Sequence, residues 1–151
     1  IPISTRKVIV LHTRTIPQGI TAMLSFDPDA DDNTNAIEMQ KAAEKIVTGQ
    51  ITFAARDSQA DGHDIKKGDL MALLGGKITF VDNDLPKTVM KLLKQMVKRD
   101  SQFITVIHGE DVTEEQAAAI EAQINEKYGS KAEITVINGG QPIYYYIISV
   151  E

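Results

Sequence analysis

The sequence predicts an α/β domain built in two layers, a mixed β-sheet with about three helices packed on it. Three observations predict this fold class. Strand-like apolar runs alternate along the chain with segments whose apolar residues recur at the helical period. Two similar segments, residues 104–109 and 134–139, flank a capped helical segment. This pattern is typical of a crossover between parallel strands. A Gly75-Gly76 pair between two further apolar runs predicts an antiparallel hairpin, so the sheet must be mixed.

Length, composition and charge exclude several classes of protein. The chain has 151 residues, 42% hydrophobic and 25% charged, which is typical of one globular domain. No apolar run approaches the ~20 residues of a membrane-spanning helix, so no membrane span is expected. The absence of cysteine excludes disulfides and thiolate metal sites and fits a cytoplasmic location. The net charge of -5 repels phosphate backbones, so no nucleic-acid partner is expected.

Residues 1–15 are predicted to be a terminal strand and connector that belong to a truncated upstream part. Within them, residues 7–12 carry four consecutive apolar side chains, a pattern typical of a strand buried in a parallel sheet. The neighbours of such a strand would precede Ile1, and the chain has no initiating Met, so we expect a fragment of a longer protein. Residues 16–151 then form the C-terminal domain. A bare strand edge at 7–12 can also pair with a second copy, so a homodimer is an open expectation.

The next segment, 15–26, is predicted to be a connector because Pro17 and Gly19 interrupt it and an acidic stretch follows. A helix is predicted over 35–47, with a polar N-cap before it and a glycine just past its end.

Two further helices carry clear end signals. One covers 85–98, with Asp84 as its N-cap and Pro86 in its first turn. The other opens with a capping box of Thr113 and Gln116 and runs to the next glycine. Alternation and β-branched or aromatic content predict strands over 50–56, 69–74, 77–81, 103–108, 132–138 and 143–150.

Polar residues end three of the apolar strands. Because the carboxyl ends of parallel strands meet at one edge of a sheet, His12, His108 and Asn138 are expected to come together there. Glycines follow two of these strands at Gly109, Gly139 and Gly140. Their backbone N–H groups would suit an anion. The alternative is that these polar residues simply begin loops.

The acidic stretch before the first predicted helix has the offsets of a calcium loop. The matching positions are Asp27, Asp29, Asp31, Asn33, Asn35 and Glu38. However, Asp32 replaces the glycine of the sharp turn, and Pro28 stiffens the second position. A solvated acidic loop that stabilises the following helix N-terminus is the preferred interpretation, and no metal site is predicted.

Lysines form a row on one face of the predicted helix 85–98. They are spaced by four, three and four positions, at Lys87, Lys91, Lys94 and Lys98. Most rows of this kind are solvated surface. The alternative is a basic interface for an acidic partner or for phosphates.

No catalytic motif is present in the sequence. It has no Walker loop, no dinucleotide-binding glycine pattern, no nucleophile elbow and no metal-spaced histidine pair. No catalytic residue is therefore predicted, and binding or assembly is the preferred function class.

Several collinear motifs resemble one known family. They are TIPQG at 15–19, LSFDP at 24–28, TGQITFAARD at 48–57, IKKGD at 65–69, HGEDV at 108–112, GGQPIY at 139–144 and the terminal Ser149-Val150-Glu151. Together they resemble the C-terminal domain of the bacterial fatty acid kinase ATP-binding subunit, long labelled dihydroxyacetone-kinase-like.

The resemblance implies a DegV-like fold and a noncatalytic part of a kinase. In that family an upstream domain, similar to the nucleotide-binding subunit of dihydroxyacetone kinase, holds ATP and magnesium, so no cofactor is expected in this chain. A separate DegV-like fatty-acid-binding protein carries the acyl group, whose carboxylate is phosphorylated for lipid metabolism. The expected partners are that protein and the rest of the chain's own kinase.

Polar residues inside the family-like motifs are the remaining candidates for a partner surface or a connecting turn. They are Arg14, Gln18, Arg56, Asp57 and Gln141. Their alternative role is structural, because turns rich in Gly and Pro often serve backbone geometry alone. DegV-like proteins bind the acyl carboxylate near a glycine-containing polar loop, and residues 139–142 correspond to such a place. A small-anion or acyl-binding site at the strand ends is therefore the alternative function.

Overall fold

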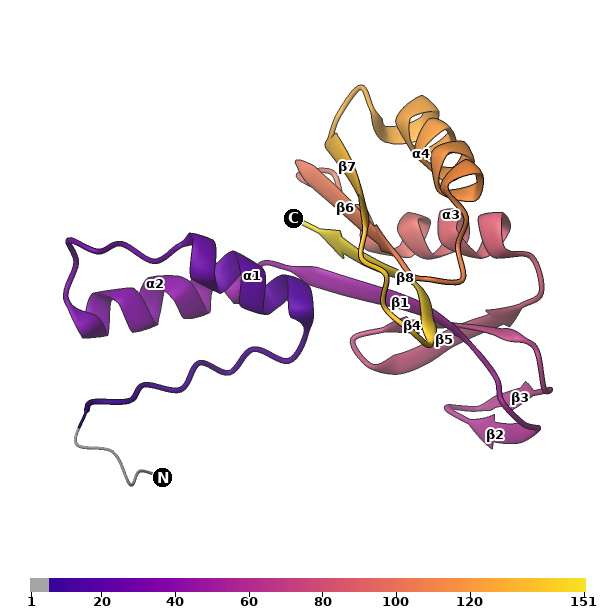
Figure 1. Ribbon diagram of the computed structural model, residues 1–151, viewed down its shortest axis with the longest axis horizontal. Coiled ribbons are helices and arrows are strands. Elements are labelled where there is room, and N and C mark those ends of the chain that lie inside the picture. The colour runs from indigo at the N-terminus through magenta and orange to yellow at the C-terminus, as the bar shows by residue number, and fades with distance from the viewer. Residues whose placement is uncertain (1–5) are drawn as a thin grey trace. The chain divides into compact units, whose positions relative to one another are not determined.

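The computed structural model describes residues 6–151. The described residues form two compact units, which divide between Ile46 and Val47 (Figure 1). The boundary predicted at residues 15 and 16 lies inside the first unit. That unit contains α1 (Ile16–Leu24) and α2 (Asp32–Glu44), which pack against each other.

The prediction of a connector over 15–26 is wrong, because most of this segment forms helix α1. Pro17 lies in the first turn, where its missing N–H has no helical partner to lose. Thr15 is the N-cap, and its side chain accepts a hydrogen bond from the backbone N–H of Gln18 at 3.3 Å. Gly19 is tolerated because a single glycine weakens a helix without ending it.

Helix α2 begins three residues before the predicted start. Asp31 is its N-cap, and one of its carboxylate oxygens accepts hydrogen bonds from the N–H groups of Asn33 and Thr34 at 2.9 and 3.0 Å. The Thr34 hydroxyl donates to the same carboxylate and, with these N–H groups, lowers the pKa of Asp31 below 3.8.

The strand predicted over 7–12 is wrong. Its residues belong to no sheet, because the described part of the first unit contains no strand that could pair with them. Val8 and Val10 are 60% and 75% exposed. The segment is fixed instead by the N–H of His12, which donates to Gln40 at 2.9 Å.

The second unit is built on a six-stranded sheet. In spatial order its strands are β5 (Lys77–Asp82), β4 (Leu70–Leu74), β1 (Val47–Phe53), β8 (Tyr144–Val150), β6 (Phe103–His108) and β7 (Glu133–Asn138). Only β6 and β7 are parallel, and the other neighbouring pairs are antiparallel. The predicted mixed sheet is therefore confirmed.

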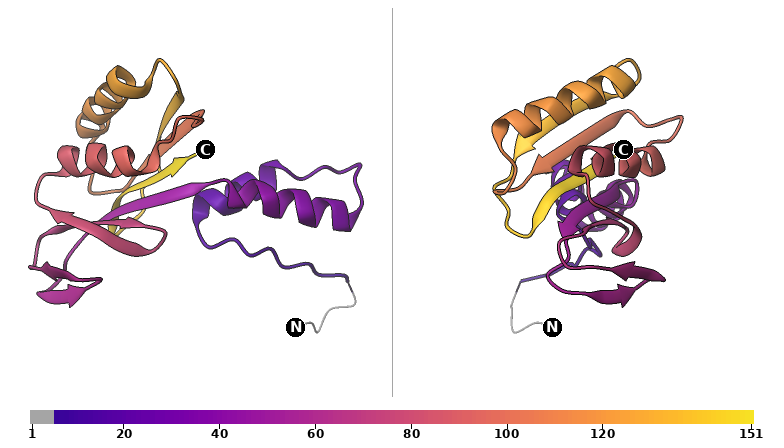
Figure 2. Two further views of the ribbon diagram at one scale, coloured as in Figure 1. Left: turned by 180° about the vertical axis from the view of Figure 1, so that it is seen from behind. Right: turned by 90° about the vertical axis from the view of Figure 1, so that its right-hand side faces the viewer.

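Two helices cover one face of this sheet (Figure 2). They are α3 (Leu85–Met96) and α4 (Glu114–Tyr128). Their buried side chains pack in one core with strand residues such as Ile51 and Tyr146, which are register partners and therefore share a face. Helix α4 links β6 to the parallel strand β7, as the similarity of residues 104–109 and 134–139 predicts.

The predicted hairpin at Gly75-Gly76 is confirmed, with φ values of 60° and 84° that favour glycine. The structure contains a second hairpin that was not predicted. It is formed by β2 (Ser58–Ala60) and β3 (His63–Ile65). The described residues contain four helices rather than about three, because α1 replaces the expected connector.

Candidate partner-binding surface

Only two of the three predicted polar strand ends exist, because His12 follows no strand. His108 and Asn138 are register partners at the ends of β6 and β7. The carboxylate of Glu114, the first residue of α4, occupies the space beside them. It accepts a hydrogen bond from the Asn138 amide at 2.8 Å and lies 4.0 Å from Nε2 of His108. An anionic ligand at this edge would meet a carboxylate of the chain itself.

The glycine N–H groups at this edge are also occupied. The N–H groups of Gly139 and Gly140 both donate to the backbone oxygen of His108, at 2.9 and 3.3 Å. The Gln141 side-chain amide donates to Ile107 O and Tyr144 O, at 3.1 and 3.4 Å. These contacts hold the 139–143 loop against the strand ends and leave fewer donors for a bound anion.

Gly109 allows the loop to approach this closely. A Cβ at this position would lie 2.3 Å from Tyr144 O and 2.6 Å from Gln141 O, both backbone atoms. The backbone N–H of Gly109 donates to Tyr145 O at 2.9 Å. A side chain here would therefore push the start of β8 away from the end of β6.

Three buried polar atoms beside the loop have no hydrogen-bond partner among the described residues: Nδ1 of His108, Oε1 of Gln141 and the hydroxyl of Tyr146. His108 and Tyr146 are opposite each other in the β6–β8 register, and their exposed fractions are 3% and 0%. Burial raises the pKa of the Tyr146 hydroxyl to about 12, so it is neutral at physiological pH.

The lysine row is a run of like charges on the surface of the second unit. Its members, Lys87, Lys91, Lys94 and Lys98, are all exposed, and none forms an ion pair with a described residue. Lys98 does not lie on the helix as predicted, because α3 ends at Met96 and Val97 is extended. The opposite face of α3 is anchored in the core by Val89, Leu92, Leu93 and Met96. The helix therefore presents its cations outward from a fixed scaffold.

Two lysines of the row have local interactions. Lys91 Nζ lies 4.3 Å from the centroid of the Phe80 ring, a cation–π contact. The backbone N–H of Asn83 lowers the pKa of Asp82, with smaller contributions from Lys87 and Lys91. Both interactions leave the row positively charged.

Four other predicted residues lie outside this edge of the sheet. Arg14 and Gln18 belong to the first unit, where the backbone N–H of Arg14 donates to the Gln18 side chain at 2.9 Å. Arg56 and Asp57 follow β1 and are exposed, and Asp57 accepts a hydrogen bond from the N–H of Lys67 at 2.8 Å. The Gln18 side chain, in the first turn of α1, thus holds the segment that leads into this helix, and the Asp57 side chain holds the segment that follows β1.

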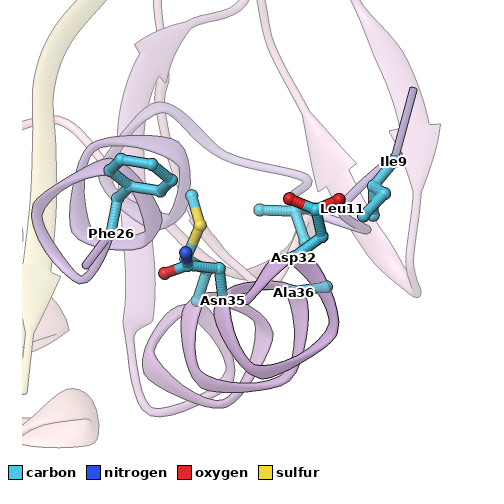
Figure 3. Close-up of a pocket in the computed structure, with 7 residues that line it drawn as sticks. Ile9, Leu11, Phe26, Asp32, Asn35 and Ala36 are labelled. Carbon is cyan, nitrogen blue, oxygen red and sulfur yellow. The ribbon is translucent and has the colours of Figure 1, made fainter. Parts of the chain in front are cut away.

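The first unit contains a pocket that the sequence did not suggest (Figure 3). It has a volume of ≈ 220 Å³ and is lined by Ile9, Leu11, Phe26, Asp32, Asn35, Ala36 and Met39. The buried Asn35 side chain is committed to the backbone of Asp27, donating to its oxygen and accepting from its N–H, both at 2.8 Å. Asp32 pairs with Lys7 at 3.1 Å. The apolar run at 8–11 was the available signal for this pocket.

Among residues 6–151 no group of three or more His, Cys, Asp or Glu side chains is placed to hold a metal ion. The acidic stretch instead makes local contacts, including the Asp31 cap and the N–H of Asp29, which donates to Asp27 at 2.9 Å. No helix in this described part is long and apolar enough to span a membrane.

Comparison with known proteins identifies the family. The model of the FakA-like C-terminal family, which describes the C-terminal region of a type of fatty acid kinase subunit, matches residues 2–151. The chain belongs to this family. The Bacillus subtilis (strain 168) protein YloV is 39% identical over 145 residues, 96% of this chain and 26% of YloV. The Staphylococcus haemolyticus protein SH1689 is 39% identical over 143 residues, 95% of this chain and 26% of SH1689.

Membership of the FakA-like C-terminal family confirms the resemblance that the motifs predicted. The chain spans about a quarter of the length of the curated relatives it matches. It is thus a C-terminal-type domain of a fatty acid kinase subunit family.

Proposed function

We propose that this chain is a noncatalytic docking domain of a fatty acid kinase subunit. It engages a DegV-like fatty-acid-binding protein, so that an ATP- and magnesium-binding domain elsewhere in the kinase can phosphorylate the acyl carboxylate. The observation that carries the proposal is the lysine row on α3, which is exposed, free of ion pairs among the described residues and fixed by the core. A row of this kind favours a protein surface rich in carboxylates.

The alternative of an acyl or anion site at the strand ends has less support. Glu114 already places a carboxylate beside His108 and Asn138. The N–H groups of Gly139 and Gly140 are bonded to the chain's own backbone. A second carboxylate at this edge would have to overcome repulsion and displace existing hydrogen bonds.

Charge reversal on α3 tests the docking role. In the full-length subunit, the double variant Lys87→Glu/Lys94→Glu inverts two charges and leaves the Lys91–Phe80 contact intact. The matched control, Lys66→Glu/Lys67→Glu, makes the same change in net charge at two other exposed lysines. Calorimetric titration with the fatty-acid-loaded partner measures the Kd of each variant at low and high salt.

We expect the α3 variant to raise the Kd at least tenfold at low salt, because attraction between the row and an acidic partner becomes repulsion. The difference from wild type should shrink at high salt, which screens exposed charges. The control should bind like wild type. Equal affinity of the α3 variant and wild type at both salt concentrations would contradict the proposal.

A further inference from the structure

The first unit buries too little apolar surface to be stable by itself. Its described residues, 6–46, bury only four apolar side chains, those of Pro17, Ala22, Ala43 and Ile46. Chains of about 40 residues usually need disulfides, a metal ion or a further packing surface to fold. The sequence has no cysteine, and no group of described residues is placed to hold a metal ion. The first unit therefore needs a packing surface beyond its own residues.

Helix α1 has an apolar face that the described residues leave exposed. Of the large apolar side chains that are exposed among residues 6–151, nine belong to the first unit and four to the second. Four of the nine are in α1, where spacings of four, three and one place them on one side of the helix. They are Ile16, Ile20, Met23 and Leu24, with exposed fractions of 61%, 41%, 67% and 82%. Such a face is typical of a helix that packs on a further layer.

Residues 8–11 have the properties of a strand at an open sheet edge. Within the described part of the chain, no hydrogen bond is made by the backbone N–H or carbonyl groups of these four residues. Their side chains alternate, because Ile9 and Leu11 line the pocket in Figure 3 whereas Val8 and Val10 are 60% and 75% exposed. Free backbone groups and a side-chain period of two are what a neighbouring strand requires of its partner.

The same residues pack loosely on α2. Two hollows, of ≈ 220 and ≈ 330 Å³, are each lined by Ile9 and Leu11 on one side and by Ala36 of α2 on the other. Finished protein cores contain few voids larger than a water molecule. The contact between residues 9–11 and α2 is thus incomplete, and further apolar side chains are needed to close it.

The residues that precede the matched region in the longer relatives fit these requirements. The matched region is 26% of the length of YloV and of SH1689, and the family model describes a C-terminal region. About three quarters of each relative therefore lies outside it, on the N-terminal side. A strand that is apolar on both faces is typical of a parallel sheet, whose neighbouring strand is joined by a crossover of a dozen or more residues. The preceding length is ample for such a strand and its crossover.

A second copy of the chain fits less well. Two copies of residues 7–12 could pair edge to edge, and that pairing would bond one row of backbone groups. It would leave the outward side chains of Val8 and Val10 and the apolar face of α1 exposed. Covering a helix face together with both faces of a strand takes a packed layer rather than a single added strand.

We infer that the first unit is an interaction surface for the preceding part of its own kinase subunit. That part adds a strand beside residues 7–12 and an apolar layer over the exposed face of α1. The first unit thereby attaches the second unit to the rest of the subunit. This inference concerns residues 6–46 and is independent of the docking role proposed for the second unit.

Hydrogen exchange in the 151-residue chain and in the full-length subunit tests this attachment. We expect the amides of residues 8–11 to exchange freely in the 151-residue chain. In the full-length subunit at least two of the four amides should exchange about 100-fold more slowly, since one neighbouring strand bonds alternate residues. Residues 104–107 of β6, which are bonded in the sheet, are the internal control and should be protected in both proteins.

The variant Val10→Asp places a charge on the outward side of the segment. Because Val10 is 75% exposed, the variant should leave the Tm of the 151-residue chain within about 2–3 °C of wild type. In the full-length subunit it should remove at least tenfold of the protection at residues 8–11. The matched control, Ile137→Asp, makes the same change at an exposed residue of β7 and should leave this protection intact.

Three results would overturn the inference. The first is free exchange of residues 8–11 in the full-length subunit, because no strand would then be added. The second is equal protection in the 151-residue chain, since the chain would then supply its own cover. The third is protection of the 151-residue chain that grows with its concentration, which would assign the surface to a second copy. None of these results bears on partner binding measured by calorimetry, so the proposed function stands or fails separately.

Discussion

Substitution of Gly109 by alanine tests the close approach between the 139–143 loop and the end of β6. The added Cβ would lie 2.3 Å from Tyr144 O and 2.6 Å from Gln141 O, whereas ordinary contacts begin at 3.4 Å. The obstructing atoms belong to the backbone, so no side-chain rotation can relieve the contact. The start of β8 must therefore move by about 1 Å to bring the 2.3 Å contact to 3.4 Å, and overpacking relieved by a backbone shift costs stability.

Two hydrogen bonds are lost or weakened by that movement. They run from Gly109 N–H to Tyr145 O at 2.9 Å and from Glu110 N–H to Gln141 O at 3.1 Å. At about 1 kcal/mol for each bond and about 1–3 kcal/mol for overpacking, Gly109→Ala should destabilise the second unit by about 3–5 kcal/mol. At about 4 °C per kcal/mol for a unit of this size, the Tm should fall by about 12–20 °C.

The assay is thermal and urea unfolding followed by circular dichroism. The matched control is Gly19→Ala in α1, where an added Cβ has no atom within 4 Å. This control should leave the second unit unchanged and stabilise α1 by about 0.5–1 kcal/mol, because alanine favours a helix over glycine. If Gly109→Ala unfolds within about 2–3 °C of wild type, a shift within the ordinary ±0.5 kcal/mol of neutral surface substitutions, the close approach is refuted.

Two further predictions concern buried and capping groups. Tyr146→Phe should leave stability at neutral pH unchanged or slightly higher, because it removes a buried hydroxyl that has no partner among the described residues. The folded pKa of Tyr146, about 12, lies above its ordinary value of 10.0, so the unfolded state loses its proton first and stability should fall as pH rises from 10 to 12. Urea unfolding across this range should show a smaller loss for Tyr146→Phe, and an identical loss would contradict the assigned burial. Thr113→Ala should destabilise the second unit by about 1 kcal/mol, because the Thr113 side chain caps α4 by accepting from Gln116 N–H. Thr113→Ser is the control that keeps the cap, and equal stability of the alanine and serine variants would show that the capping box is dispensable.

Much of the second unit could be predicted because local signals and tertiary packing agree there. The Thr113 and Gln116 capping box fixes the start of α4, and the glycine pair at 75–76 permits only a few turn geometries. The similar sequences of β6 and β7 predicted a parallel pair, and the structure confirms it, with every residue from Phe103 to His108 in register with β7. In each case a short stretch of sequence carries the physical reason for the structure.

The first unit was predicted less well because its signals are ambiguous. Pro17 marks a helix start as readily as a break, and the Thr15 cap decides between them. The apolar run at 8–11 has the composition of a strand, but a strand exists only where a neighbour supplies hydrogen bonds. Periodicity in one segment carries no information about its partner.

The candidate surface was predicted only in part. Lys87, Lys91 and Lys94 lie on the exposed side of α3, as their spacing predicts, whereas Lys98 lies beyond the end of the helix. The Glu114 contact to Asn138 joins residues 24 positions apart and depends on the crossover geometry. The positive φ of Ile143 could not be foreseen, because isoleucine is among the residues least expected in that conformation.

The most direct test of the docking role is calorimetric titration, at two salt concentrations, of the full-length subunit. The titrants are the DegV-like fatty-acid-binding protein loaded with fatty acid and, separately, the free fatty acid. We predict saturable binding of the protein that weakens as salt rises, with no binding of the free fatty acid to the subunit. Binding of the free fatty acid without binding of the protein would contradict the account.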